Sequence, residues 1–302
     1  MRIGVDLGGT KIEVIALDDH GTTLLRRRVP TPTGDYVGTV DAIAGLVFSA
    51  EKEIGELGTV GVATPGAISL RTGLIKNSNS TALNGKPLDR DIMTKLGRAV
   101  RLENDANCFA LSEAVDGAAA GANIVFGVIL GTGVGGGVSV NKRPLTGHNR
   151  IAGEWGHNPL PWANEGERLS TRCYCGKPDC IETFLSGAGL AREYRNHTGN
   201  NYTAQEIALA ANAGNEDARE CLKTYQDRLA RSLASVINMI DPDAIVLGGG
   251  LSNIPDLYVG LPDLIATYAF SDGIDSRIVP AAHGDSSGVR GAAWLWPVVS
   301  PY

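Results

Sequence analysis

Apolar residues in the first part of the chain form short runs that predict buried strands separated by polar turns. The opening is a meander of three strands, with glycines in its first bend at 7–11. Between 36 and 55 the apolar residues recur at helical spacing instead. We expect strands at 2–6, 12–17, 23–29, 59–63 and 100–103, and helices at 36–55, 87–96 and 106–116.

The same order of elements then repeats in the second part of the chain. The expected elements are strands at 124–130, 134–140 and 244–247 and helices at 218–240 and 284–294. A glycine turn, Gly131-Thr132-Gly133, joins the first two of these strands, as glycines do at the start of the chain. Strands with glycine turns, followed by helices and recurring in two halves, predict a duplicated α/β fold with a cleft between two domains.

Length and charge narrow the class of protein. The chain has 302 residues, enough for two domains, and its 43% hydrophobic and 20% charged residues are typical of a globular protein. A net charge of −6 disfavours nucleic acid or an anionic membrane as a partner. Since no apolar run spans a bilayer and Met1 leads directly into a strand, we expect no membrane segment and no signal peptide. Cysteines that serve as metal ligands need a reducing compartment, so we expect a cytoplasmic protein.

Three glycine-rich bends follow expected strands, at 6–11 (DLGGTK), 130–133 (LGTG) and 247–250 (LGGG). Glycine lets the backbone approach a phosphate closely enough for amides to donate to its oxygens. The first bend fits neither the Walker pattern nor G-x-G-x-x-G, because it leads into a strand. A tight hairpin explains any single bend, whereas three bends in two halves favour nucleotide phosphates. Asp6, at a strand end, can hold a water of a hydrated Mg²⁺ or simply stabilise the turn.

Three cysteines within eight positions follow a histidine in the second half of the chain. The four residues are His157, Cys173, Cys175 and Cys180. Three thiolates and one imidazole are the ligand set of a closed tetrahedral zinc site. Glu154 and Glu182 flank these ligands, so an ion that fixes the loop would also fix two carboxylates able to bind a ligand. A surface cysteine cluster, or a zinc knuckle with no ligand nearby, is the alternative.

Asn104 and Asp105 lie where an expected strand meets an expected helix. The simpler interpretation is a helix N-cap. The functional interpretation is that Asp105 accepts the proton of an attacking hydroxyl, because phosphoryl transfer needs a carboxylate near an oriented alcohol. The polar residues of expected loops and strand ends that suit the hydroxyls of a sugar are Asn79, Asn104, Glu154, His157 and Glu182. Taken singly, each is more simply a solvated loop residue.

Together these motifs resemble the ROK group of sugar kinases over essentially the full length of the chain. The resemblance is carried, in chain order, by the first two glycine bends, the E-W-G-H sequence at 154–157, the cysteine loop at 173–182 and the third glycine bend. The nearest branch is that of bacterial fructokinases and mannokinases. Three segments match it: 152–161 (AGEWGHNPLP), 76–85 (KNSNSTALNG) and 283–296 (HGDSSGVRGAAWLW).

The resemblance implies the actin-like ATPase fold, which is a duplicated ribonuclease H-like fold, with a zinc-bearing insertion. It implies a smaller domain of residues 1–117 plus 288–302 and a larger one of 118–287 that carries the zinc loop and nucleotide site. Asp105 matches the catalytic base. The sugar-binding positions are matched by Gly66, Asn79, Asn104, Asp105, Glu154, His157 and Glu182. The positions for ATP and Mg²⁺ are matched by Asp6, Gly8, Gly9, Thr10, Lys11, Gly131, Thr132, Gly133, Gly248, Gly249 and Gly250. The Zn²⁺ ligands are matched by His157, Cys173, Cys175 and Cys180.

The activity implied by the resemblance is ATP-dependent phosphorylation of fructose or mannose at O6. An N-acetylglucosamine or glucose kinase of the same family is the alternative, because it would share every motif above. A sugar-responsive regulator is a remote alternative, since the first phosphate-binding strand begins at Ile3 and leaves no room for a DNA-binding domain. We therefore expect a small-molecule hexose as substrate, a homodimer, and no nucleic-acid or membrane partner.

Overall fold

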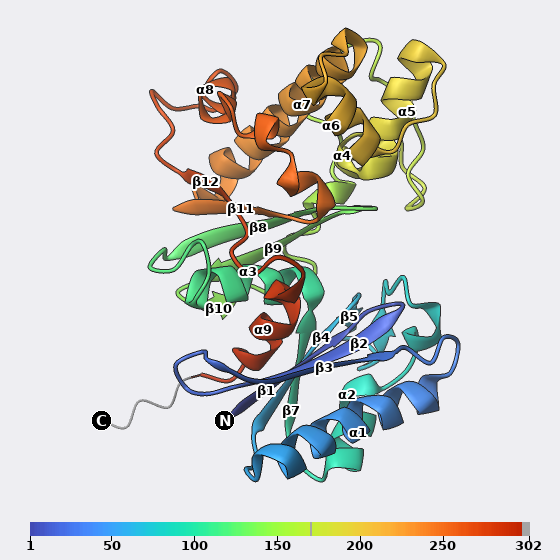
Figure 1. Cartoon of the computed structure of the whole chain (residues 1–302), viewed down its shortest axis with the longest axis vertical. Helices are drawn as coiled ribbons and strands as arrows, with labels where there is room; N and C mark the ends of the chain where they lie inside the picture. Colours follow the sequence, from blue (N-terminus) through green and yellow to red (C-terminus); the bar gives the residue numbers. More distant parts are fainter. Residues whose placement is uncertain (170, 298–302) are drawn as a thin grey trace.

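The structure is a computed structural model that describes residues 1–169 and 171–297. Two lobes lie one above the other along the long axis of the molecule, and each is built on a five-stranded sheet (Figure 1). The first sheet uses strands from the beginning of the chain, and the second uses strands that follow residue 123. The C-terminal residues 298–302, which the sequence assigned to the smaller domain, lie outside the described residues.

The lower sheet in Figure 1 combines a meander with two parallel strands. In spatial order its strands are β3 (Thr23–Pro30), β2 (Lys11–Leu17), β1 (Arg2–Leu7), β4 (Thr59–Thr64) and β7 (Val100–Asn104). β1 pairs antiparallel with β2 and β2 with β3, whereas β4 and β7 run parallel to β1. The helices α1 (Tyr36–Ile54) and α2 (Leu88–Leu96) bury their apolar residues against the outer face of this sheet.

The upper sheet repeats this arrangement. Its strands, again in spatial order, are β10 (Arg143–Pro144), β9 (Val134–Val140), β8 (Ile124–Leu130), β11 (Ala244–Gly248) and β12 (Arg277–Pro280). β9 pairs antiparallel with β8 and β10, and β11 and β12 run parallel to β8. Its outer face carries α4 (Ile181–Leu185), α5 (Gly187–Thr198), α6 (Ala204–Asn212), α7 (Glu216–Ile240) and α8 (Leu261–Ala266). The duplicated α/β fold predicted from the sequence is confirmed, because the two sheets share one strand order.

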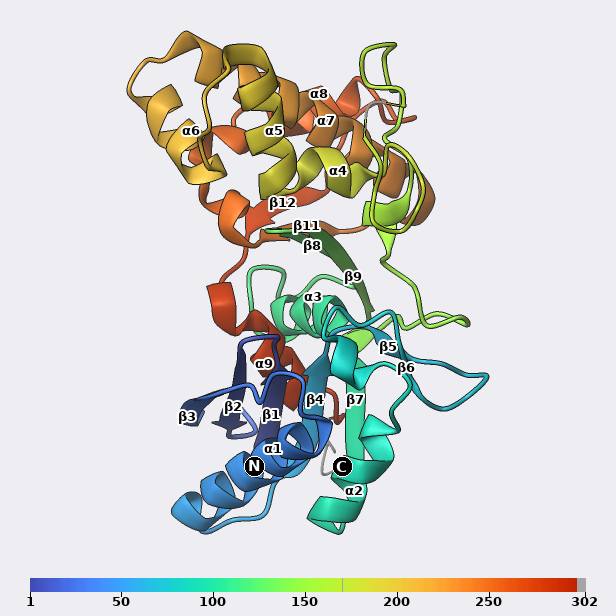
Figure 2. The same cartoon turned by 90° about the vertical axis from the view of Figure 1, so that its right-hand side faces the viewer.

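Two helices lie between the sheets, α3 (Asp105–Val115) and α9 (Ser287–Ala293) (Figures 1 and 2). They pack directly on each other, because a Cβ at Gly291 would overlap the carbonyl of Cys108. Glycines in the strands allow the same close approach: a Cβ at Gly4 would overlap the Val289 carbonyl of α9. The two lobes therefore meet through a helix pair with almost no side-chain spacing, and α3 places its first residue at the cleft.

Short elements fill the connections that shape the cleft. They are β5 (Ala67–Ile68), β6 (Ile75–Lys76) and the 3₁₀ turns η1 (Thr81–Leu83), η2 (Trp155–His157), η3 (Gly250–Asn253), η4 (Pro255–Leu257) and η5 (Gly284–Ser286). No helix in the described ranges is long and apolar enough to cross a membrane.

The expected elements are present, with shifted ends. α3 begins at Asp105 rather than at 106, and the last helix is divided into η5 and the short α9. The sequence pattern did not predict α5, α6, α8 or β12, which follow the zinc loop and complete the upper lobe. The domain boundaries at 117/118 and 287/288 stay a prediction.

Candidate active site

The junction between β7 and α3 places Asp105 as the first residue of its helix. Asn104 is the N-cap: its side-chain oxygen accepts a hydrogen bond from the Ala106 amide at 2.9 Å. One oxygen of Asp105 accepts from the same amide at 2.9 Å. The capping function considered for this pair therefore belongs mainly to Asn104.

A cavity of about 260 Å³ lies where the lobes meet, beside the start of α3. It brings together residues that are far apart in the sequence, including two carboxylates and four glycine-bend or loop residues. These six are Asp6, Gly8, Gly9, Asn79, Asp105 and Gly249. One aspartate from the first strand and one from α3 therefore share a small polar space with two of the three glycine bends.

Burial controls the protonation of both carboxylates. Burial raises the pKa of Asp105 to about 6, and the negative charge of Glu154 adds to the rise. Burial also raises the pKa of Asp6 to about 7, with further contributions from the charges of Asp105 and Glu13. A carboxylate with a pKa near 6 is suited to accept a proton at neutral pH, because its basicity is higher than that of an exposed aspartate.

A glycine turn supports the side of the cleft below Asn104. Gly66 has φ +79°, and a Cβ there would overlap the carbonyl of Lys76, so only glycine fits. The side-chain nitrogen of Asn104, Nδ2, donates a hydrogen bond to the Gly66 carbonyl at 3.2 Å. Beyond this turn, Asn84 holds the backbone of Ser78 through two hydrogen bonds of 2.8 and 2.9 Å, which fixes the loop that carries Asn79.

The four expected zinc ligands converge at one point. The donor atoms of His157, Cys173, Cys175 and Cys180 all lie within 4.8 Å of one another. The Cys173 Sγ is 3.6 Å from His157 Nδ1, and the sulfurs of Cys175 and Cys180 are 3.6 Å apart. A tetrahedral zinc ion with bonds of about 2.0–2.3 Å separates its ligand atoms by about 3.5–3.8 Å. The residues therefore fit zinc, through Nδ1 of the histidine.

The turn that brings the cysteines together is formed by residues that are neighbours in the chain, but the loop before it is held by residues of the distant helix α7. The Cys173 amide donates to the Lys177 carbonyl at 2.9 Å and closes the turn. Glu167, buried in the loop before the cysteines, accepts hydrogen bonds from Arg228 and Arg231 of α7 at 2.7 to 3.0 Å. Burial alone would raise the pKa of Glu167, but the hydrogen bonds from Arg231 and Arg228 lower it to about 2. A buried ion pair thus fastens the zinc loop to the longest helix.

The carboxylates that flank the zinc ligands lie on the upper side of the cleft. Glu182 accepts a hydrogen bond from the Val134 amide at 3.0 Å, so it is tied to the β8–β9 turn that contains Gly133. The His157 Nε2 contacts the Tyr174 hydroxyl at 3.1 Å, which leaves Nδ1 for the metal. Glu154 is exposed at the start of η2, close enough to influence Asp105 electrostatically.

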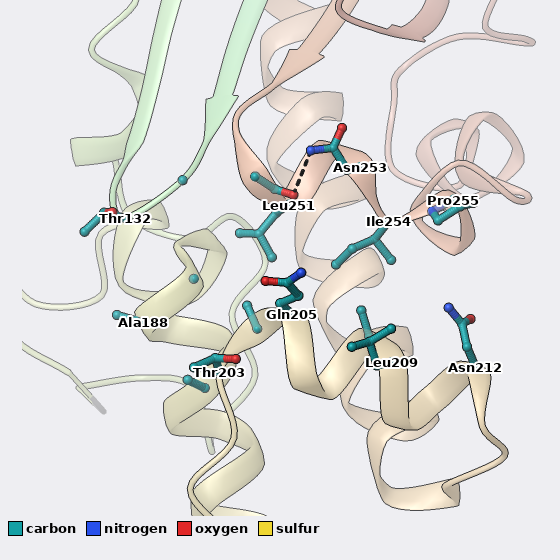
Figure 3. A pocket seen from close by; sticks show the side chains of 16 residues that line it. Thr132, Ala188, Thr203, Gln205, Leu209, Asn212, Leu251, Asn253, Ile254 and Pro255 are labelled. Carbon is teal, nitrogen blue, oxygen red and sulfur yellow. Dashed lines mark hydrogen bonds between the residues drawn. The ribbon is translucent and has the colours of Figure 1, made fainter. Parts of the chain in front are cut away.

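A second cavity, of about 890 Å³, opens beside the β8–β9 turn (Figure 3). Gly131 and Thr132 form one edge, and Gly250 begins the opposite wall at η3. Gly249 lines the smaller cavity and Gly250 the larger one, so the β11 glycines connect the two spaces. An extended ligand with a bulky group in the large cavity can therefore direct its other end toward Asp105.

The predicted nucleotide residues divide into three groups. Gly8, Gly9 and Gly249 line the small cavity, whereas Gly131, Thr132 and Gly250 line the large one. Gly248 packs instead on Phe109 of α3, where a Cβ would come within 2.7 Å of the ring. Thr10 and Lys11, the last two residues of the first bend, and Gly133 line neither cavity.

The predicted sugar residues are not all in one closed space. Asn79 and Asp105 line the small cavity, but Glu154, His157 and Glu182 do not. Asn79 lies between β6 and η1 and Asp105 begins α3, whereas the upper set comes from η2 and the start of α4, on either side of the cysteines. Both sets border the cleft between the lobes, where only a ligand that reaches across can contact both.

The sequence pattern did not predict the elements that form one wall of the large cavity. This wall is formed by residues of α5, α6, η3 and η4, of which Ala188, Thr203, Gln205, Leu209, Ile254 and Pro255 are labelled in Figure 3. A signal for α6 is present: Thr203 and Glu206 form a capping box, a pattern that marks a helix start. Its relation to a nucleotide depends on packing that the local pattern does not reveal.

Fold and site together define a class of protein. Two ribonuclease H-like sheets enclose a cleft with a carboxylate at its centre, glycine bends on both sides and a large adjoining cavity. This is the arrangement of a phosphotransferase with the actin-like ATPase fold.

Comparisons with known proteins agree with this class. The ROK family model matches residues 2–298, and the chain therefore belongs to the ROK family. N-acetyl-D-glucosamine kinases from Shigella boydii and Vibrio cholerae are each 42% identical to it, over 98% of this chain and 99% of theirs. The expectation of a ROK family sugar kinase is confirmed.

Solved structures give the same result for the fold. A ROK hexokinase from Thermus thermophilus has a TM-score of 0.86 and 31% identity, with 97% of each chain covered. A ROK family glucokinase from Streptomyces griseus, in complex with glucose and AMPPNP, has a TM-score of 0.73 and 28% identity, covering 97% of this chain and 98% of the other.

Proposed function

We propose that this protein transfers the γ-phosphate of ATP to the O6 hydroxyl of a hexose and that N-acetyl-D-glucosamine is its preferred hexose. The observation that carries the choice of sugar is the 42% identity, over 98% of the chain, to N-acetyl-D-glucosamine kinases. The sequence motifs favoured fructose or mannose and gave this sugar as the alternative. The similarity to N-acetyl-D-glucosamine kinases favours N-acetyl-D-glucosamine over fructose and mannose.

Asp105 is the general base. Its pKa of about 6 and its position in the small cavity support this assignment, because a base near neutrality is ionised yet still basic enough to take the O6 proton. Asn104 binds the sugar beside it, and Gly66 and Asn79 shape the lower wall of the sugar site. Such a base contributes about 10²–10⁴-fold to the rate.

Glycine amides and Asp6 receive the phosphates. Gly8, Gly9 and Gly249 line the space next to Asp105, where their backbones can approach a phosphate without side-chain interference. Asp6 would hold Mg²⁺ through its water shell, and this ion supplies charge neutralisation to the triphosphate when bound. The adenosine occupies the large cavity between Thr132 and α6.

The zinc loop sets the upper wall of the sugar site. Glu154, His157 and Glu182 bind sugar hydroxyls, and a zinc ion held through Nδ1 would leave Nε2 of His157 to face a hydroxyl in place of Tyr174. Because upper and lower residues line separate parts of the cleft, binding a hexose draws the lobes together and excludes water. A homodimer and a cytoplasmic location stay predictions.

Fructose or mannose is the second candidate. The segments 76–85, 152–161 and 283–296 support it, since they carry the resemblance to fructokinases and mannokinases. These segments form the Asn79 loop, the Glu154 region and η5 with α9, and Asn79, Gly284 and Gly288 line the small cavity beside the proposed sugar site.

A coupled assay on four hexoses decides between these assignments. We expect kcat/KM for N-acetyl-D-glucosamine to exceed those for glucose, mannose and fructose by roughly tenfold or more, a difference of about 1.4 kcal/mol in transition-state binding. Phosphorus NMR of the product should place the phosphate on O6. A higher value for fructose or mannose would reject the first sugar in favour of the second candidate. No turnover with any hexose would reject the kinase assignment.

A further inference from the structure

Glu103 is the second-to-last residue of β7, and its carboxylate connects three segments of the chain. It precedes Asn104 and the base Asp105, and it faces the same side of the sheet as Asp6, because both pair in register with Ala63. None of the roles assigned above uses it. Its two oxygens accept three hydrogen bonds, which is an unusually complete set for a partly buried side chain at a cleft.

One oxygen of Glu103 holds the start of the base helix. Oε1 accepts from the Asn104 amide at 2.9 Å and from the Asn107 side-chain nitrogen at 3.1 Å. Asn107 is only 3% exposed, and its own oxygen accepts from the Val138 amide of β9 at 3.2 Å. The residues on both sides of Asp105 are thereby fixed to the lower sheet through Glu103 and to the upper sheet through Asn107.

The other oxygen of Glu103 holds the loop that leads to the sugar-binding carboxylate. Oε2 accepts from the Thr146 hydroxyl at 2.6 Å. Thr146 begins the loop after β10, and its carbonyl accepts from the Ala152 amide at 3.3 Å, just before Glu154. Lys76 of β6 supports the same loop by donating to the Asn149 carbonyl at 3.0 Å. The loop is therefore tied to the lower lobe although it belongs to the upper one.

We propose that Glu103 is a positioning residue that fixes the base Asp105 and the loop carrying Glu154 relative to each other. The inference rests on the proposed hexose kinase function. A single rigid carboxylate between two segments that must both contact the hexose reduces the number of arrangements that the site samples before reaction. Since effective positioning of reacting groups is worth several orders of magnitude in rate, the loss of this link should be visible in kinetics.

Three variants separate the hydrogen bonds of Glu103 Oε1, from Asn104 and Asn107, from that of Oε2, from Thr146. Glu103→Leu removes both sets of hydrogen bonds. Thr146→Val removes only the Oε2 hydrogen bond and keeps the shape of the side chain at position 146. Glu103→Gln can keep both, because its oxygen can accept from Asn104 and Asn107 while its amide donates to the Thr146 hydroxyl, which can also act as an acceptor. Glu220→Leu is the control for the leucine substitution, since Glu220 is exposed on α7.

We expect a distinct kinetic result for each variant. Glu103→Leu should lower kcat by roughly 10–100-fold and raise the KM for the hexose, with the KM for ATP unchanged, since hydrogen bonds to a charged group are worth about that factor. Thr146→Val should raise the hexose KM by roughly tenfold with little change in kcat. Glu103→Gln should stay within a few-fold of the parent enzyme but become strongly sensitive to Thr146→Val, because the amide then loses its acceptor.

Amide hydrogen exchange of the protein without sugar tests the link independently of the reaction. Glu103→Leu should speed exchange both at 104–107 and at 145–153, Thr146→Val only at 145–153, and Glu220→Leu at neither. Unchanged exchange at both segments in Glu103→Leu would overturn the inference, and so would faster exchange with unchanged kcat and hexose KM. Absence of hexose turnover in the parent enzyme would reject the proposed function instead, while the exchange result would still decide whether Glu103 joins the two segments.

Discussion

Replacement of Asp105 by asparagine should reduce catalysis and increase stability in the same variant. Asparagine keeps the shape of the side chain and its oxygen can still accept from the Ala106 amide, so the fold at the start of α3 is preserved. It cannot take a proton from O6, and we expect kcat to fall by about 10²–10⁴-fold, equivalent to about 3–5 kcal/mol of activation free energy. The hexose KM should change little.

The stability gain follows from the pKa of Asp105 and depends on pH. Below about pH 3 the carboxyl is mostly protonated in both the folded and the unfolded chain, so the substitution has little effect on the free energy of unfolding, and at pH 4 the effect is still well under about 1 kcal/mol. As pH rises, the unfolded chain ionises first, and ionisation of the buried group in the folded state becomes a penalty. Above about pH 6 the penalty is complete. The difference between the usual pKa of 3.8 and about 6 corresponds to at most about 3 kcal/mol.

Urea unfolding at pH 8 and pH 4, with kinetics on the same preparations, tests both parts. Asp105→Asn should be more stable than the parent by about 1–3 kcal/mol at pH 8 and nearly equal to it at pH 4. In the parent enzyme kcat/KM should decline as pH falls below about 6, because the base becomes protonated. Near-normal kcat in the variant would remove Asp105 from the mechanism. A stability difference independent of pH would show that its charge is not the cause.

Four further substitutions test the metal loop, its anchor and the glycine bends. Cys175→Ser should abolish bound zinc, measured by mass spectrometry, and raise the hexose KM by roughly tenfold or more, since the sugar-binding carboxylates lose their support. Glu167→Gln should lower the free energy of unfolding by about 1.5–3 kcal/mol, seen in chemical denaturation, because Arg228 and Arg231 lose the charge of their shared acceptor and keep only Glu193 and Asp227 as ion-pair partners. Gly249→Ala should reduce thermal stability, because φ is +82° and the new Cβ would overlap a β8 carbonyl. Gly250→Ala should leave stability intact and raise only the KM for ATP, since no atom lies within 4 Å of the new Cβ.

Matched controls make these outcomes specific. Cys221→Ser changes a buried thiol of α7 and should keep the metal, so zinc loss there would contradict a local site. Equal stability of Gly249→Ala and Gly250→Ala would contradict the steric account of the β11 bend. A fully active Cys175→Ser protein without zinc would contradict the supporting role of the metal.

Most of the fold and part of the site were accessible from the pattern of residues. The strands of both sheets except β10 and β12, and the helices α1, α2, α3 and α7, followed from apolar spacing, because those residues bury one face of each element. The cysteines of the candidate zinc site followed from spacing, since three cysteines within eight positions can reach one point by a single turn. By contrast, α5 and α6 were missed, although Thr203 opens a capping box, and with them the wall of the large cavity.

The sequence alone determined most of the strands, the glycine bends, the cluster of one histidine and three cysteines, and the presence of an aspartate at a strand end. These features depend on interactions among neighbours in the chain, which spacing and residue type report directly. Only the tertiary structure decided that Asp6 and Asp105 share a cavity, that Gly249 and Gly250 face different spaces, and that Glu103 reaches Thr146 across 43 positions. The reason is physical: such contacts arise where packed sheets and helices bring distant segments together, and their direction depends on the burial of the whole molecule.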